Sequence, residues 1–516
     1  MNIVWLSLKE GTPGRGYWDQ RLLEEFFIEE KHIEANSIPN LEDMIVVIPG
    51  AYQAEYAEEI KTQLLRIKDC KVIITSDEEN KFPIDELDLP NVRVFATYYN
   101  KKYKGDITWL PIGPANVFDI PLPDKTNDFV FAGQVTHPAR ENFIKEVRKA
   151  GINGFLLETD GFAQGDKPED YFRLLSTSKV APSPAGNISP DAFRTYEAIC
   201  AGAVPIATSP EFHEAVFGSV PFPVIESFGQ VEGYMKDAIA LYPRLNNEVQ
   251  AWWLKYKRSM KRQLLGEKRG DVTVVIPCSP IKSHPSIKVI AETIRTVREH
   301  LPYAEIIVTF DGVRSEQEDR RADYEEFKRR FLWECYHNKK FSNILSLIFD
   351  EHMHQVKMAR EALKFVESDN VLYVEQDTPL TPDYEIDWDK CFEFLASGEA
   401  NVIRFHFEAF VPEEHKHLMI GEVENGFLKT YQWSQRPHLI TTAYFDSILQ
   451  KNFTEDAVCF IEDKMHGVVQ DEVSRFGLNG WYQHRIWIYH PEGSIKRSYH
   501  LDGREGEAKW DNTQTW

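Results

Sequence analysis

The sequence predicts an α/β protein in which a pair of Rossmann-like domains is followed by one further α/β domain. Three observations support this. Short apolar runs alternate with amphipathic stretches, as in parallel sheets covered by helices. The alternation restarts after a proline-rich connector at 119–128 and again after a basic stretch at 252–270. A chain of 516 residues is also too long for a single hydrophobic core.

The first Rossmann-like domain is expected at 1–123. Buried apolar runs bounded by turn residues predict its strands, at 2–8, 44–49, 71–76, 92–98 and 107–113. Apolar residues at helical spacing predict its helices, at 19–33 and 54–67.

The second Rossmann-like domain is expected at 124–265. Its predicted strands lie at 129–133, 154–159, 179–184, 204–209 and 222–227. Its predicted helices, 141–151 and 191–202, both close on glycine, which is a common helix end. The basic stretch 252–270 is interpreted as a linker helix.

The third domain is expected at 271–516 and has no internal repeat. Its predicted strands are 271–279, 304–312, 343–350 and 370–377, and its predicted helices are 287–301, 314–332 and 359–368.

Composition restricts the partners. The net charge of −22 disfavours nucleic acid and anionic membranes, although the basic run at 255–269 leaves a DNA acceptor open. Six scattered cysteines without zinc or disulfide spacing favour buried thiols in a reducing compartment. No signal peptide or apolar run of roughly 18 residues is present, so we expect a cytoplasmic protein without a membrane span.

Acidic residues follow two predicted strands of the third domain. Asp311 ends one strand, at the position where parallel sheets bind ligands, although an Asp-Gly pair is also a common turn. Glu375 and Asp377 end another strand. Because side chains alternate along a strand, both should point the same way and could share a divalent cation. Mn²⁺ or Mg²⁺ is therefore the predicted cofactor.

Later in the same domain, Glu462 and Asp463 begin a predicted helix. Acidic residues in a first helical turn also stabilise the helix electrostatically, so this alternative stays open. The tail carries His490, Arg497 and His500. Either histidine is a candidate metal ligand, although a lone histidine is more often a structural hydrogen bonder.

In the second domain, the segment 183–209 leads from a glycine loop into a helix and a strand. The helix N-terminus beyond Gly186 could hold a diphosphate, Arg194 could pair with phosphate, and Glu197 could accept hydrogen bonds from ribose. An ordinary loop–helix–strand unit is the alternative. The glycine loop 11–16 does not have dinucleotide-binding spacing.

These motifs resemble two glycosyltransferase families. The third domain resembles the large inverting GT-A family (family 2-like), in Thr273–Pro277, Glu305–Gly312, the acidic pair after 371–374 and Glu462-Asp463. The segment 183–209 resembles the exostosin-like GT-B glycosyltransferases. The expected architecture is thus a GT-B-like pair followed by a GT-A-like domain.

The GT-A resemblance implies residue roles in the third domain. Pro277, Cys278 and Asp311 would flank the uracil and ribose, Asp377 would bind the metal, and Glu375, in place of the family's first Asp, would lie beside the nucleotide sugar. Asp463, paired with Glu462, would deprotonate the acceptor. His490 or His500 would be an extra metal ligand, and Arg497 would hold the diphosphate.

The exostosin resemblance adds Arg140 as a diphosphate ligand, with His137 as a further candidate. It identifies no base; Asp19 and Glu24 are only guesses. Together the resemblances imply a bifunctional glycosyltransferase using UDP-linked donors and a glycan acceptor. The alternatives are a single catalytic module with an acceptor-binding partner module, a phage-type transferase acting on hydroxymethylated DNA bases, and a non-enzymatic carbohydrate-binding protein.

Overall fold

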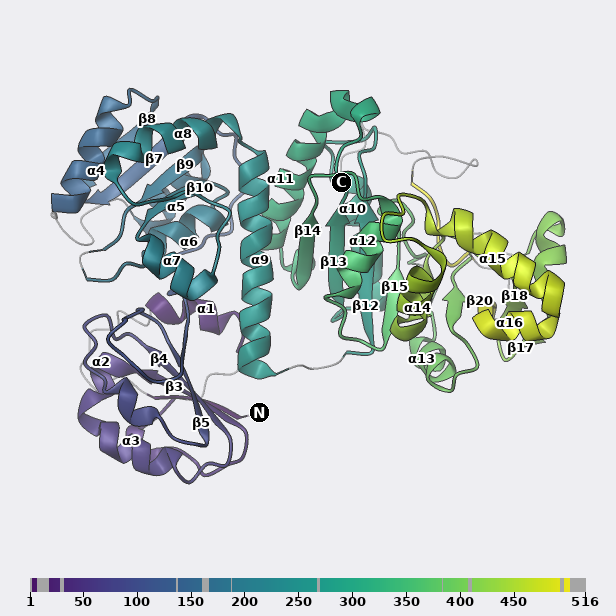
Figure 1. Cartoon of the computed structure of the whole chain (residues 1–516), viewed down its shortest axis with the longest axis horizontal. Helices are drawn as coiled ribbons and strands as arrows, with labels where there is room; N and C mark the ends of the chain where they lie inside the picture. Colours follow the sequence, from purple (N-terminus) through teal and green to yellow (C-terminus); the bar gives the residue numbers. More distant parts are fainter. Residues whose placement is uncertain are drawn as a thin grey trace. The chain divides into compact units, whose positions relative to one another are not determined.

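The computed structural model describes residues 2–6, 18–27, 32–135, 138–159, 167–186, 188–266, 270–382, 384–406, 411–491 and 496–501. The chain divides into two compact units, unit 1 at Met1–Gly266 and unit 2 at Glu267–Trp516 (Figure 1). Unit 1 contains two separate parallel sheets, and unit 2 contains one mixed sheet.

The first sheet of unit 1 has the strand order β2-β1-β3-β4-β5-β6, and all its pairs are parallel. Its strands are β1 (Asn2–Leu6), β2 (His32–Ile33), β3 (Met44–Pro49), β4 (Cys70–Thr75), β5 (Val92–Ala96) and β6 (Ile107–Trp109). Its helices are α1 (Arg21–Glu24), α2 (Gly50–Gln53) and α3 (Ala57–Leu64). Alternate strand residues pack on α3, as a period of two requires.

The predicted helix at 19–33 is wrong. In the described part of this stretch, the turn η1 (Trp18–Gln20) is followed by the four-residue helix α1, and His32 and Ile33 instead pair with Trp5 and Leu6 as strand β2. The apolar residues that suggested a long helix pack against this sheet: Leu22, Leu23, Phe26 and Phe27 are buried. Tertiary packing therefore overrides the helical periodicity.

The second sheet of unit 1 has the order β11-β10-β9-β7-β8 and is also parallel. Its strands are β7 (Asn127–Gln134), β8 (Gly154–Thr159), β9 (Ser178–Ser183), β10 (Val204–Thr208) and β11 (Val224–Ile225). Its helices are α4 (Pro138–Lys149), α5 (Pro168–Ser176), α6 (Phe193–Cys200), α7 (Pro210–Phe217) and α8 (Val231–Ala240).

Helix α9 (Arg244–Leu265) belongs to unit 1 and is not a solvated linker. It buries Trp253, Met260 and Leu264 and contacts α6 and β10. Lys257, in the basic run, has its Nζ 2.7 Å from an Oε of Glu25. Packing and ion pairing therefore engage part of the run that left DNA binding open.

Unit 2 has the strand order β14-β13-β12-β15-β19-β16-β20-β18-β17. Strands β14 to β15 are parallel, and β19 runs antiparallel between β15 and β16. The strands are β12 (Val272–Cys278), β13 (Glu305–Phe310), β14 (Ile344–Ile348), β15 (Asn370–Tyr373), β16 (Val402–Arg404), β17 (Met419–Glu424), β18 (Phe427–Thr430), β19 (His438–Thr441) and β20 (Ile486–Tyr489).

Helices cover both faces of this sheet. They are α10 (Lys288–His300), α11 (Arg321–His337), α12 (His354–Leu363), α13 (Trp388–Ala396), α14 (Thr442–Asn452), α15 (Ile461–Phe476) and α16 (Leu478–His484). Val274 and Ile276 of β12 pack in the core with α10 and α11. Val275 packs in the opposite core with α12, α14 and α15. This two-sided burial explains the continuous apolar run of β12.

Short 3-10 turns complete both units: η1 (Trp18–Gln20), η2 (Ala35–Ser37), η3 (Ala54–Tyr56), η4 (Ile84–Leu87), η5 (Phe228–Gln230), η6 (Ser315–Arg320), η7 (Lys339–Phe341) and η8 (Glu413–Leu418). In the described part of the chain, no helix combines the length and apolar character needed to cross a bilayer.

Candidate functional site

The strand order of unit 2 reverses between β12 and β15: β13 and β14 follow on one side of β12, while β15 lies on the other. In α/β sheets, ligands bind beyond the carboxyl ends of the strands at such a point. Pro277 lies near the end of β12, in register with Thr309 of β13. Gln376, after β15, donates from Nε2 to the Ser279 carbonyl at 3.0 Å. The loops after β12 and β15 are therefore held together.

Glu375 and Asp377 lie on a turn and not on a strand. Strand β15 ends at Tyr373, and the Thr378 amide donates to the Glu375 carbonyl at 3.1 Å. Strand alternation therefore does not set the directions of the two carboxylates, because the backbone turns between them; that both bind one cation stays a prediction. Glu375 instead contacts Gln355, and Asp377 lies beside His500.

Glu375 has an unusual protonation equilibrium. Burial, followed by the nearby charges of Asp377 and Glu462, raises the pKa of Glu375 to about 8. Arg436 and a 2.7 Å hydrogen bond from Gln355 Nε2 act in the opposite direction without cancelling the rise. Glu375 is therefore mostly neutral at pH 7 in the ligand-free protein.

Two glutamines connect Glu375 to the start of α15. Gln355 Oε1 accepts hydrogen bonds from Gln435 Nε2 and from the Ile461 amide. The amide of Gln435 donates to Glu462 Oε2 at 3.1 Å. The predicted acidic pair is thus brought to the same edge as Glu375. The sequence contains no signal for these glutamines, since neither belongs to a charged or periodic pattern.

The two members of the acidic pair differ in exposure. Glu462 is half-buried, whereas Asp463 is exposed to solvent. The charge of Asp463 acts on Cys459, whose thiol pKa is raised chiefly by burial. Asp463 therefore remains accessible to a molecule arriving from solvent.

The segment 496–501 carries two predicted ligands to this edge. His500 Nε2 lies 3.6 Å from Asp377 Oδ2, and the Leu501 amide donates to the Asp377 carbonyl at 3.0 Å. His490 lies beyond the end of β20 and donates its amide to the Gly426 carbonyl at 2.7 Å. In the sheet, β20 is separated from β15 by β19 and β16, so of the two histidines His500 is the one beside Asp377.

Arg497 is a buried cation at the same edge, only 2% exposed. Its guanidinium carbon lies 5.2 Å from the centre of the Tyr384 ring. Among the described residues, its Nε and one Nη have no hydrogen-bond partner. Burial lowers the pKa of Arg497. Buried donors without acceptors are costly, which makes this guanidinium a candidate anion site.

The carboxylate of Asp311 interacts with other groups of this protein. Its Oδ1 accepts hydrogen bonds from the amides of Met353 at 2.6 Å and His354 at 3.2 Å, and its Oδ2 lies 2.9 Å from His352 Nδ1. The carboxylate therefore fixes the loop that begins α12. Its predicted position at the end of β13 stands, while its contact with a nucleotide stays a prediction.

Unit 1 has a comparable edge, where the order of the second sheet reverses between β7 and β9. Arg140 donates from Nε to the Ala185 carbonyl and from Nη1 to the Gln134 carbonyl, each at 3.1 Å. Arg140 thus joins the loops after β9 and β7. Burial, followed by the charge of Arg194, lowers its pKa to about 10.

Arg194 also binds the protein's own groups. It donates from Nη2 to the Ala132 carbonyl at 2.7 Å and from Nε to the Tyr171 hydroxyl at 2.9 Å. Its guanidinium lies 4.6 Å from the centre of the Phe131 ring. Gly133 makes this approach possible, because a Cβ there would collide with the guanidinium.

Glu197 is buried and holds the segment that leads from the first sheet to the second. Its Oε1 accepts from the Asn116 amide at 3.1 Å, and burial raises its pKa to about 7. Asp191, which the sequence did not single out, similarly accepts from the Ile112 amide at 3.0 Å. Gly186 donates to the Ser189 carbonyl at 3.0 Å. The residues predicted to bind a nucleotide sugar in unit 1 thus lie around one edge of its second sheet. Their hydrogen bonds, however, join neighbouring segments of the protein.

The contacts of Asp19 and Glu24, the two candidate bases in unit 1, do not indicate that either is a catalytic base. Asp19 is buried and accepts from the Ser76 amide and, at 2.8 Å, from its hydroxyl. Burial raises the pKa of Asp19. Glu24 lies on the surface 3.7 Å from Arg21. His137 and the loop 11–16 lie outside the described residues.

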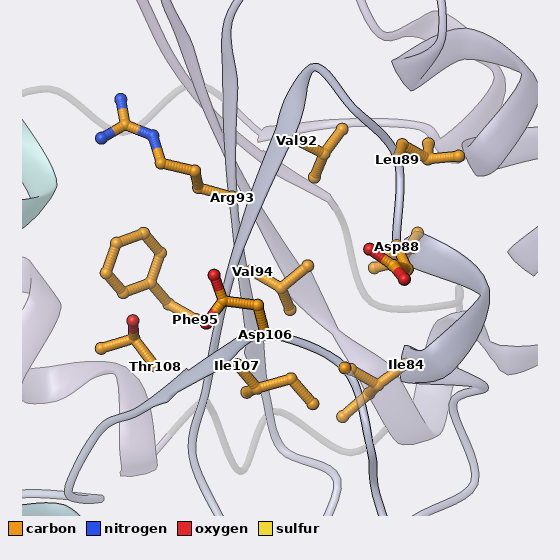
Figure 2. A pocket seen from close by; sticks show the side chains of 12 residues that line it. Ile84, Asp88, Leu89, Val92, Arg93, Val94, Phe95, Asp106, Ile107 and Thr108 are labelled. Atoms are coloured by element: carbon orange, nitrogen blue, oxygen red, sulfur yellow. The ribbon is translucent and has the colours of Figure 1, made fainter.

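A cavity of about 280 Å³ lies elsewhere in unit 1, along β5 and β6 and the segments that precede them. Figure 2 shows the aliphatic side chains of Ile84, Val94 and Ile107 around it. Its polar side chains, such as Arg93 and Asp106, are exposed, and it is not at the carboxyl edge. We assign no chemistry to it.

Asp377 and His500 can supply only part of a metal's coordination. Among the described residues, no group of three or more histidine, cysteine and acidic side chains is positioned to hold a metal. A carboxylate suits Mn²⁺ and Mg²⁺, and Mg²⁺ often takes one or two carboxylates with its remaining ligands from phosphate and water. Asp377 therefore fits an ion that arrives with a phosphate ligand, and His500 lies 3.6 Å from its carboxylate.

Comparisons with known proteins give the following. No protein-family model matches the sequence, and no curated protein does. S. aureus TarS 1–349 matches at 16% identity and a TM-score of 0.29, covering 45% of this chain and 61% of that chain. Its complex with UDP-GlcNAc matches at 18% and 0.30, covering 46% and 60%.

A putative glucose-1-phosphate thymidylyltransferase from Bacillus anthracis, in complex with a sucrose, matches at 11% identity and a TM-score of 0.28. The match covers 87% of that chain and 43% of this chain. The match spans less than two thirds of the TarS chains and only 36% of the longer one. Likenesses at these values carry no argument about what this chain binds or does.

Proposed function

We propose that this chain is a glycosyltransferase that moves a sugar from a UDP-linked donor to a glycan acceptor. The proposed donor site is the carboxyl edge of the sheet in unit 2. The observation that carries the proposal is Arg497: a cation 2% exposed, with guanidinium nitrogens that lack partners among the described residues. A nucleotide sugar offers a diphosphate, whose oxygens match the fork of donors on an arginine.

The metal part of the proposal rests on Asp377 and His500. They would hold Mn²⁺ or Mg²⁺ together with oxygens of the diphosphate. The bound ion would neutralise the charge that develops on the leaving group. Pro277, Asp311 and Glu375 would line the nucleotide side, since all three lie at or near the ends of adjacent parallel strands.

Asp463 is the proposed general base. It is exposed in the first turn of α15, so its carboxylate can meet an acceptor hydroxyl and accept the proton as the new glycosidic bond forms. Glu462 is tied to Gln435 and is the positioning member of the pair. Inversion at the anomeric carbon is the outcome that the family resemblance implies.

A second donor site in unit 1 would make the enzyme bifunctional, with Arg140, Gly186, Arg194 and Glu197 around the nucleotide. One observation favours the alternative, in which unit 1 binds acceptor and does not transfer sugar. The hydrogen bonds of its two arginines and Glu197 join the protein's own groups. Two sites on one chain would in either case raise the effective concentration of acceptor.

The test is a screen of sugar nucleotides with Mn²⁺, Mg²⁺ or chelator, following slow donor hydrolysis and thermal shift. Wild type is compared with Asp377→Asn and Glu197→Gln. Loss of one donor with Asp377→Asn supports the unit 2 site, and loss of a different donor with Glu197→Gln supports two sites. If no donor is hydrolysed or bound, the transferase proposal fails and metal-independent glycan binding becomes the better account.

A further inference from the structure

The segment 496–501 is attached to the candidate site by a ladder of main-chain hydrogen bonds. The Thr381 amide donates to the Arg497 carbonyl at 2.9 Å, and the Tyr499 amide donates to the Pro379 carbonyl at 3.0 Å. Leu380 and Ser498 form an antiparallel bridge between these bonds. The segment therefore runs beside the loop that carries Asp377 and is joined to it by an isolated antiparallel bridge.

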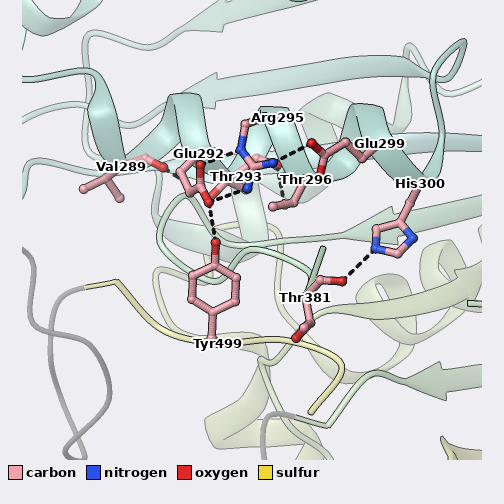
Figure 3. A network of polar contacts seen from close by, with 9 residues as sticks. All are labelled: Val289, Glu292, Thr293, Arg295, Thr296, Glu299, His300, Thr381 and Tyr499. Atoms are coloured by element: carbon pink, nitrogen blue, oxygen red, sulfur yellow. Dashed lines mark hydrogen bonds and ion pairs between the residues drawn. The ribbon is translucent and has the colours of Figure 1, made fainter. Parts of the chain in front are cut away.

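One side chain connects this segment to α10, as Figure 3 shows. The Tyr499 hydroxyl donates to Glu292 Oε1 at 2.6 Å. Arg295 binds the same carboxylate with two donors, at 2.7 and 2.8 Å. Glu292 is 7% exposed, and Arg295, followed more weakly by Tyr499, holds the pKa of its carboxyl below the usual range. The acceptor is thus a fixed, charged carboxylate.

Helix α10 also holds the other side of the loop. Thr293 donates from Oγ1 to the Gln376 carbonyl at 2.7 Å. Figure 3 shows the second contact, in which a ring nitrogen of His300 lies 3.0 Å from the Thr381 carbonyl. One helix therefore fixes both the loop with Asp377 and, through Tyr499, the segment with Arg497 and His500. Hydrogen bonds to charged groups are roughly twice as strong as neutral ones, so the Tyr499 contact is a major attachment.

We propose that Tyr499 is a positioning residue of the donor site, and that its hydrogen bond to the Glu292–Arg295 pair sets His500 beside Asp377 and fixes the segment that carries Arg497. This inference rests on the proposed function, because the site it assembles is the proposed metal–diphosphate site. It goes further by assigning Tyr499, Glu292 and Arg295, none of which is among the residues proposed to bind the metal or the diphosphate. Removal of the Tyr499 hydroxyl should loosen the segment 496–501 and weaken donor binding without changing any residue that binds the metal or the diphosphate.

The test is Tyr499→Phe in the full chain, titrated with UDP in the presence of Mn²⁺ by calorimetry. We expect the dissociation constant to rise about tenfold, as for the loss of one charge-assisted hydrogen bond. Tyr482→Phe is the matched control, because Tyr482 is 52% exposed on α16. In a His500→Ala background, the effect of Tyr499→Phe should shrink, because the two changes act on one unit.

Equal UDP affinity of wild type and Tyr499→Phe would overturn the inference. Hydrogen exchange separates this result from a failure of the proposed function. If wild type does not bind UDP, the amides of Thr381, Tyr499 and Leu501 still report the attachment. Faster exchange at these amides in Tyr499→Phe supports the positioning contact while the donor proposal falls, and unchanged exchange overturns both.

Discussion

The carboxyl edges of units 1 and 2 both contain arginines shielded from solvent, half-buried in unit 1 and buried in unit 2, but these arginines have different partners. In unit 1, Arg194 donates to the Ala132 carbonyl and the Tyr171 hydroxyl, and Arg140 joins two loops through their carbonyls. In unit 2, two nitrogens of the buried Arg497 have no partner among the described residues. The arginines of unit 1 therefore bind the protein's own groups, whereas under the proposed function the donors of Arg497 would bind a ligand.

The difference in hydrogen-bond partners affects the free energy of folding. An arginine that pairs with carbonyls compensates its desolvation and adds to the stability of the fold, whereas unpaired buried donors lower it. A site that binds an anion carries this cost until the ligand arrives. Comparing stability with ligand affinity, variant by variant, therefore distinguishes supporting residues from binding residues.

The largest effect is expected for the proposed base. Asp463→Asn keeps the size of the side chain but cannot accept a proton, so we expect kcat to fall about 10²- to 10⁴-fold. UDP affinity should stay unchanged, because Asp463 does not hold the nucleotide. Steady-state kinetics with calorimetric binding measures both. Any transfer that survives in Asp463→Asn and is then abolished by Glu197→Gln would demonstrate a second active site in unit 1, so that its edge would also bind a donor.

The arginines provide the most direct comparison. Arg497→Met should weaken UDP binding about 100-fold or more, because charge-assisted bonds are lost, while the unfolding free energy changes by less than about 1 kcal/mol or rises. Arg194→Met should lower the stability of unit 1 by about 2–4 kcal/mol, since two partners lose their donor. Urea unfolding and UDP titration are measured on both variants. If Arg497→Met lost stability and Arg194→Met lost UDP affinity instead, Arg497 would be the supporting residue and Arg194 the binding residue.

A smaller effect concerns pH. The pKa values of Glu197, about 7, and Glu375, about 8, are raised by burial above those of the unfolded chain, so the folded state binds more protons. Stability should therefore fall as pH rises, from about 4.5 to 7 in unit 1 and to 8 in unit 2. Each carboxyl contributes at most about 1.4 kcal/mol per pH unit.

Glu197→Gln and Glu375→Gln each remove one of these titrations. Calorimetric melting at pH 5, 6, 7 and 8 should show a flatter pH dependence for each variant than for wild type. Parallel curves for wild type and variant would contradict the burial of that carboxyl. Mn²⁺ with UDP should also lower the pKa of Glu375, because a nearby cation favours the charged form.

The smallest effect is expected at Lys257. Its ion pair with Glu25 is partly exposed, so Lys257→Met should cost unit 1 about 1 kcal/mol or less. The melting of unit 2 and any binding to duplex DNA at physiological salt should be unaffected. A salt-dependent loss of DNA binding in this variant would revive a DNA acceptor.

Much of the secondary structure could be predicted from the sequence, because buried parallel strands leave long apolar runs. The run 273–277 predicted β12, and 44–49 predicted β3. The prediction failed where local periodicity competes with pairing, as at 19–33, where a strand forms beside β1. Asp377, Glu462 and His500 could be selected as candidates because acidic and imidazole groups after strands or at helix starts are recognisable.

Short-range patterns sufficed to show that acidic residues follow two strands of unit 2 and that the chain contains separate α/β sheets. Long-range contacts were needed to show that Glu375 contacts Gln355 while Asp377 lies beside His500. Such contacts also attach the distant segment with Tyr499 to α10 and connect β7 to α5 through Arg194. The physical reason is that side-chain partners are set by residues far apart in the chain, which no local pattern encodes.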